Sequence, residues 1–140
     1  MGLETLDHVN IRTADVTALA NWYARVLGLE RGPRPEFPFP GAWLYAGARA
    51  VVHLVGVPEA PGADPADLKL EHFAFSASGL AAFRARLDAA GVAHDLVAVT
   101  GALAAGVVDL VQLNLRDPDG NHIHVDFPAD EARALGLIGG

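Results

Sequence analysis

The chain carries the same pattern of elements twice, and this internal repeat restricts the fold more than any other feature of the sequence. In each half an acid–histidine pair stands in a predicted strand, a helix ending at a glycine follows, and a later strand carries another histidine. The matched positions are Asp7-His8 with Glu71-His72, Gly28 with Gly91, and His53 with His124. One such half cannot bury a sheet face alone, so the repeat predicts two βαβββ modules packed together.

The spacing of apolar residues locates the elements of each module. We expect strands at residues 4–12, 42–46 and 49–57 in the first module, and at 70–76, 94–99, 107–115 and 122–127 in the second. A helical stripe, Val16, Leu19, Ala20, Tyr23 and Leu27, precedes Gly28, and a second stripe, Leu80, Phe83, Leu87 and Ala90, precedes Gly91. Residues 100–106 are expected to form a loop.

These elements predict one α+β domain spanning residues 1–140, a length sufficient for a substantial core. The two βαβββ modules are expected to form a curved, cup-like mixed sheet with the helices on the outside. Module one covers residues 4–57, a linker rich in proline covers 58–67, module two covers 68–127, and a C-terminal tail covers 128–140. Residues 31–41 contain four prolines, which exclude a helix and leave a surface loop or a pocket wall.

Histidine carries the predicted chemistry. The turn Asp117-Pro118-Asp119-Gly120 leads into a strand with His122, His124 and Asp126 on one face, and imidazole is the commonest protein ligand for metals. The repeat predicts four equivalent inward positions on the concave face of the sheet, namely His8, His53, His72 and His124. We therefore expect a divalent metal there, and the absence of cysteine excludes thiolate ligands.

Several other polar residues receive smaller roles. Asn10 and Arg12 are predicted on the same strand face as His8, with apolar residues on the other face. His122 is predicted on the same strand face as His124, two residues away. These three polar residues are therefore expected to contact substrate. Each can equally belong to an ordinary polar sheet face. His94 opens an edge strand and is expected to be solvated. Asp7 and Glu71 are expected on the opposite strand face from their neighbouring histidines.

Charge and hydropathy exclude other classes of protein. The formal net charge is −7, which argues against a nucleic-acid partner because phosphate binding needs a basic surface. No apolar run is long enough to cross a bilayer. The first residues lack the basic and apolar regions of a signal peptide, so we expect a cytoplasmic protein.

Four stretches of the sequence resemble the vicinal oxygen chelate superfamily, also called the glyoxalase / bleomycin-resistance / extradiol-dioxygenase superfamily. They are Leu6–Ile11, Trp22–Leu29, Leu70–Phe75 and Asp117–Val125, and the resemblance extends over residues 4–127. It implies metal ligands at His8, His72 and His124. It also implies a fourth ligand or an acid/base group at His53, a small-molecule substrate, and a homodimer.

The sequence departs from the family pattern at two of these positions. The family usually has glutamate where this chain has His124, and its glyoxalase I branch has glutamate where this chain has His53, so the usual carboxylate base is missing. Ligation by imidazoles alone leaves the full charge of the metal, which favours an anionic bidentate substrate. Open positions on such a site suit Fe(II), with Zn, Ni or Mn as alternatives.

The leading hypothesis is a metal-dependent enzyme of the dioxygenase or lyase/isomerase type, acting on a substrate that chelates the metal through vicinal oxygens. The alternative from another class is a metal-free protein that binds a small molecule or antibiotic, as in the bleomycin-resistance branch. A third possibility, an epoxide-opening resistance enzyme, would require a basic anion pocket and a carboxylate ligand.

Overall fold

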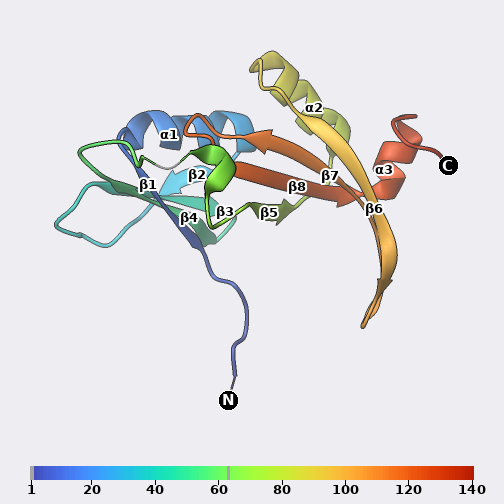
Figure 1. Ribbon diagram of the computed structural model, residues 1–140, viewed down its shortest axis with the longest axis horizontal. Coiled ribbons are helices and arrows are strands. Elements are labelled where there is room, and N and C mark those ends of the chain that lie inside the picture. The colour runs from blue at the N-terminus through green and yellow to red at the C-terminus, as the bar shows by residue number, and fades with distance from the viewer. Residues whose placement is uncertain (1, 63) are drawn as a thin grey trace. The chain divides into compact units, whose positions relative to one another are not determined.

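The computed structural model describes residues 2–62 and 64–140, which divide into two compact units, Met1–Asp64 and Pro65–Gly140. Each unit contains its own mixed sheet of four strands together with helices (Figure 1). The predicted α+β class and the two repeated modules are confirmed. In the described part of the chain, no helix has the length and apolar character needed to cross a bilayer.

The sheet of the first unit has the strand order β1-β4-β3-β2, with β1 parallel to β4 and the other pairs antiparallel. Its strands are β1 (Val9–Thr13), β2 (Glu30–Gly32), β3 (Gly41–Ala46) and β4 (Arg49–Gly56). The helical segments α1 (Val16–Trp22) and η1 (Tyr23–Leu27) connect β1 to β2.

Local chemistry fixes both ends of this helical segment. The Asp15 carboxylate caps α1 by accepting a hydrogen bond from the backbone N–H of Ala18 at 3.0 Å. Gly28 ends η1 with φ of 75°, a conformation that favours glycine, as the sequence predicts. The last turn is a π-helix, which the apolar spacing does not distinguish from an α-helix.

The sheet of the second unit repeats the arrangement as β5-β8-β7-β6, with β5 parallel to β8 and the other pairs antiparallel. Its strands are β5 (Phe73–Ser76), β6 (Asp95–Leu103), β7 (Gly106–Arg116) and β8 (His122–Pro128). Its helices are η2 (Pro65–Asp67), α2 (Leu80–Ala89) and α3 (Ala129–Ala134). The Glu131 carboxylate of α3 accepts the backbone N–H of Leu80 at 2.7 Å and so caps α2.

The fourth strand of each repeat, β4 or β8, has one face in the core and a second face that carries a histidine. In β8, Ile123, Val125 and Phe127 are buried, and Phe83 of α2 packs against Phe127 with ring centroids 5.5 Å apart. In β4, Val52 and Leu54 are buried on the corresponding face. His53 in β4 and His124 in β8 therefore lie on the same face of two equivalent strands, which is the face opposite to these apolar residues.

The turn before β8 is held by the buried carboxylate of Asp117. Its Oδ1 accepts the backbone N–H groups of Asp119 at 3.0 Å and Asn121 at 2.9 Å. Gly120 has φ of 89°, which an L side chain rarely adopts. This turn fixes the register of β8 against β7 and therefore the positions of His122 and His124.

Four features of the strands differ from those expected. Strands β1 and β5 begin at Val9 and Phe73, several residues later than predicted, and β2 was not predicted. The expected loop at 100–106 is wrong, because β6 continues to Leu103 and pairs with β7 in one long hairpin (Figure 1). Its residues are small or exposed, so they lack an apolar pattern, and backbone pairing with β7 holds them in the strand.

Candidate functional site

Three histidines of the second unit form a cluster. His72, His122 and His124 each present a ring nitrogen, and these nitrogens lie within 4.8 Å of one another. His72 directly precedes β5, which is the parallel neighbour of β8. The rings of His72 and His124 are consequently stacked, with centroids 4.0 Å apart and planes 13° apart. Imidazole nitrogens at this separation can approach one metal ion.

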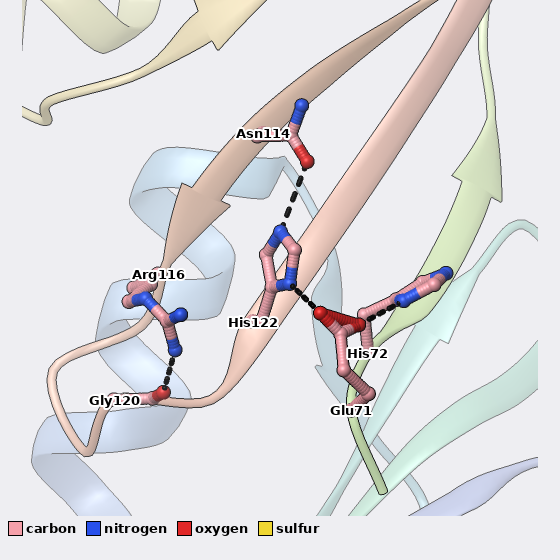
Figure 2. A network of polar contacts seen from close by, with 6 residues as sticks. All are labelled: Glu71, His72, Asn114, Arg116, Gly120 and His122. Carbon is pink, nitrogen blue, oxygen red and sulfur yellow. Dashed lines mark hydrogen bonds and ion pairs between the residues drawn. The ribbon is translucent and has the colours of Figure 1, made fainter. Parts of the chain in front are cut away.

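The Glu71 carboxylate orients two members of this cluster (Figure 2). It accepts the Nδ1–H of His72 and, at 3.1 Å, the Nδ1–H of His122. These hydrogen bonds, first that of His72 and then that of His122, lower the pKa of Glu71 and keep it ionised. Because Nδ1 of His72 carries the proton, Nε2 retains its lone pair, as a metal-ligating imidazole requires.

His122 is held at both ring nitrogens. Besides the contact with Glu71, its Nε2 lies 2.9 Å from the Oδ1 position of Asn114, which comes from β7 (Figure 2). His122 is thereby fixed in position by groups from two other segments.

His124 is the buried member of the cluster, with 7% of its surface exposed. Its Nδ1 makes no hydrogen bond to any described residue. Burial lowers the pKa of His124, and the neighbouring rings of His72 and His122 lower it further. Burial of a neutral ring nitrogen without a hydrogen-bond partner destabilises the folded state, but such a nitrogen is suited to bind a metal ion.

The first unit repeats this arrangement around His8 and His53. The two rings are stacked with centroids 3.8 Å apart and planes 11° apart. The Asp7 carboxylate accepts the Nδ1–H of His8 at 2.6 Å, and this hydrogen bond lowers the pKa of Asp7. The acid–histidine pair and the strand histidine therefore meet in the same way in both units.

His53 lies between two rings. Trp43 of β3 stacks on the side away from His8, with centroids 4.0 Å apart. The Nε2–H of His53 donates to the backbone oxygen of Ala50 at 3.1 Å, which leaves the lone pair on Nδ1. Burial, together with repulsion by His8, lowers the pKa of His53, so the ring is neutral and can accept a proton.

A cavity of about 590 Å³ opens beside this stack in the first unit. The predicted residues His8, Asn10 and His53 line it, and the proline-rich loop forms one wall. Its other notable lining side chains are Arg34, Phe37, Phe39, Trp43, Tyr45 and Arg49. The pocket-wall interpretation of residues 31–41 is therefore the correct one.

The structure groups most of the predicted site residues within their own unit. His8, Asn10 and His53 meet at the cavity, and the cluster of the second unit contains His72, His122 and His124. Arg12 is exposed on β1 and is not among the described residues that line the cavity, so its substrate contact stays a prediction. His94 was expected to be solvated, but only 12% of its side chain is exposed, and its Nδ1–H donates to the backbone oxygen of Val92 at 2.9 Å.

Two site residues, Asp7 and Glu71, were assigned to the wrong side by the sequence. Strand alternation put each on the face opposite its histidine, but both precede the first residue of the strand, where alternation does not apply. The signal was present in the sequence, because an acid stands directly before the histidine in both halves. Arg34, Phe37 and Phe39 were suggested only by the aromatic, proline-rich composition of their loop.

The two buried histidines predict a stability that depends on pH. Since the pKa values of His53 and His124 are lowered in the folded state, the unfolded state binds more protons below its histidine pKa of about 6.5. The free energy of unfolding should therefore fall as pH drops from 7.5 to 5.5, by up to about 1.4 kcal/mol per pH unit for each histidine.

Urea unfolding of chelator-treated protein at several pH values measures this slope. His53→Gln and His124→Gln should each reduce it, whereas His94→Gln serves as the matched control. An unchanged slope in both buried-site variants would contradict the assignment.

Comparison with known proteins places this geometry in a family. The model of the Glyoxalase/Bleomycin resistance protein/Dioxygenase superfamily matches residues 5–125. A curated relative, "Glyoxylase I 4" of Arabidopsis thaliana, is 30% identical over 98% of this chain and 78% of its own length.

Solved structures share the fold. A glyoxylase/bleomycin resistance protein/dioxygenase domain from Frankia sp. EAN1pec has a TM-score of 0.70 at 20% identity, covering 91% of this chain and 93% of that one. A glyoxalase/dioxygenase from Nostoc punctiforme has a TM-score of 0.68 at 19% identity, covering 89% and 90%. The repeated modules, with an acid–histidine pair and a strand histidine in each, are thus those of a member of the Glyoxalase/Bleomycin resistance protein/Dioxygenase superfamily.

Proposed function

We propose that the protein is a metal-dependent enzyme acting on a small, anionic substrate that chelates a divalent metal through vicinal oxygens. The observation that carries this proposal is the cluster of His72, His122 and His124, in which the buried Nδ1 of His124 has no partner among the described residues. Imidazole nitrogens alone suit Fe(II), Zn, Ni or Mn, and we favour Fe(II).

Within the cluster, His72 and His124 are the proposed ligands. Glu71 leaves Nε2 of His72 free, and Nδ1 of His124 is already desolvated and neutral. His122, held by Glu71 and Asn114, is proposed to contact the substrate. His8 is proposed as a further ligand because the repeat makes it equivalent to His72.

The reaction type is proposed to be that of a lyase/isomerase or a dioxygenase. A bound metal would act as a Lewis acid that stabilises negative charge on the substrate oxygens. His53 is the proposed proton acceptor, since its neutral ring has a lone pair on Nδ1 and lines the cavity with Asn10. The name of the Arabidopsis relative, a glyoxylase I, supports the lyase/isomerase type.

A second candidate is a metal-free protein that binds a small molecule or antibiotic. The cavity of the first unit favours it, because aromatic side chains dominate one wall and can hold a ligand without any metal. The proposed assembly is a homodimer in either case, and size-exclusion chromatography with light scattering would measure it.

Elemental analysis of the full chain after reconstitution separately with Fe(II), Zn, Ni and Mn decides between the two candidates. We expect a stoichiometric metal, followed by activity that consumes O₂ with a catechol or removes the α-proton of a hydroxy-carbonyl probe. A folded protein that retains none of the four metals would exclude the enzyme and leave the metal-free binder.

A further inference from the structure

We infer that the cavity of the first unit binds a planar aromatic anion, such as an arylcarboxylate or a phenolate. This inference deepens the proposed function by naming the substrate class, and only the role of that ligand as a substrate rests on the proposed function. Binding itself requires no metal, because the features that select the ligand are side chains of the first unit.

The charges around the cavity favour an anion. Arg34 and Arg49 both line it, and a guanidinium keeps its positive charge at any physiological pH. The one carboxylate in the lining, Asp7, already accepts the Nδ1–H of His8. The two arginines therefore provide net positive charge and free N–H donors for a carboxylate or phenolate oxygen.

The same wall offers flat ring surfaces. Phe37 and Phe39 are stacked with planes 9° apart, and each is 41% exposed. Trp43 lies beside them, with its ring centroid 6.5 Å from that of Phe37. Large exposed aromatic groups gathered at one cavity are typical of a surface that binds apolar ligands, and stacking selects planar ones.

Charge and ring surface are placed next to each other. The Arg34 guanidinium carbon lies 4.9 Å from the ring centroid of Phe37 and 5.1 Å from that of Phe39. The guanidinium lies over these rings, so a ligand that stacks on this wall is close to a positive charge. One molecule satisfies both features only if its flat ring carries the negative charge.

The wall is fixed before any ligand arrives. The Tyr45 hydroxyl donates to the backbone oxygen of Pro33 at 2.6 Å, and Nη2 of Arg34 donates to that of Phe39 at 2.9 Å. At the far end, the backbone N–H of Gly56 donates to the oxygen of Pro40 at 2.8 Å.

Glycine is required where this wall meets the sheet. A Cβ on Gly41 would lie 2.3 Å from the backbone oxygen of Leu54 and 2.9 Å from Nη2 of Arg34.

Because these hydrogen bonds and close contacts already order the loop, little conformational entropy is lost when a ligand binds.

Isothermal titration of the full chain with three probes of one skeleton tests the inference. The probes are 2-naphthoate, decahydro-2-naphthoate, which keeps the charge but is not planar, and 2-naphthamide, which is planar but neutral. Titrations are run with a chelator present and again with added metal. We expect 2-naphthoate to bind about tenfold more tightly than either analogue, since each lacks one of the two interactions.

Variants assign the two interactions to their residues. Arg49→Gln should weaken 2-naphthoate about tenfold and leave 2-naphthamide unchanged, because it removes a positive charge and a long hydrogen bond to the backbone oxygen of Leu6 but no ring surface. Phe37→Leu should weaken both planar probes about threefold or more by removing a ring face. Arg31→Gln, an exposed arginine of β2, is the matched control and should change nothing.

Equal affinities for the planar and the saturated acid would overturn the inference, as would an Arg49→Gln variant that binds like the parent. Thermal unfolding of each variant shows that it is folded. Selective binding of 2-naphthoate by a protein that takes up no metal would refute the proposed enzyme alone. Stoichiometric metal without any binding of 2-naphthoate would refute this inference alone.

Discussion

Replacing His124 with alanine is expected to weaken metal binding by at least about a hundredfold, more than the loss of an outer hydrogen-bond partner usually costs. The ring of His124 is nine-tenths buried, is stacked on His72, and presents an Nδ1 without a partner in the described residues. Alanine removes a donor that solvent cannot replace at a buried position. Titration with Zn or Fe(II) against a competing chelator measures the affinity.

Two further variants show whether the loss of affinity comes from the imidazole of His124. His124→Gln keeps a polar side chain at the site but lacks the imidazole nitrogen, so it should also lose the metal. His94→Ala removes a histidine that bonds to its own backbone segment, and it should bind metal like the parent. Wild-type affinity in a folded His124→Ala protein would rule out His124 as a ligand.

Replacing Glu71 with glutamine is expected to lower metal affinity about tenfold to a hundredfold without removing any ligand. The carboxylate accepts hydrogen bonds from both His72 and His122, and an amide offers one acceptor oxygen and a donor instead. One of the two rings must then rotate or change tautomer. The same chelator competition measures the loss of affinity.

Glu59→Gln makes the same substitution at another exposed glutamate and is the control for the loss of one negative charge. The expected loss should appear mainly in metal affinity, because Glu71 is largely exposed and contributes little to the core. If Glu71→Gln and Glu59→Gln bind metal equally, Glu71 does not orient the ligands.

Much of the fold could be predicted because its signals are local or repeated. The Asp-Pro-Asp-Gly turn, the glycine after each first helix and the alternation in β4 and β8 depend on nearby residues alone. The structure confirms them at Gly28, Gly120 and β8. The extent of the β6–β7 hairpin could not be predicted, because backbone pairing rather than apolar contact holds its exposed residues.

Strand alternation is informative for site residues that lie inside a strand. His53, His124 and Asn10 lie within β4, β8 and β1, where alternation gives each side chain a definite face, and their roles stay predictions. Asp7 and Glu71 lie just outside their strands, so the period assigned them wrongly. The aromatic wall depends on hydrogen bonds between the loop and β3 or β4, such as that from Tyr45 to Pro33, which no local pattern encodes.

The position of the acid–histidine pairs has a consequence for how readily this site can diverge. His8 and His72 precede their strands, with side chains 38% and 41% exposed, whereas His53 and His124 are 7% exposed within strands. Substitution at the first two positions would change the proposed set of metal ligands and leave the folded scaffold in place. Substitution at the other two alters chemistry and stability together, so evolutionary drift in metal preference should begin at His8 and His72.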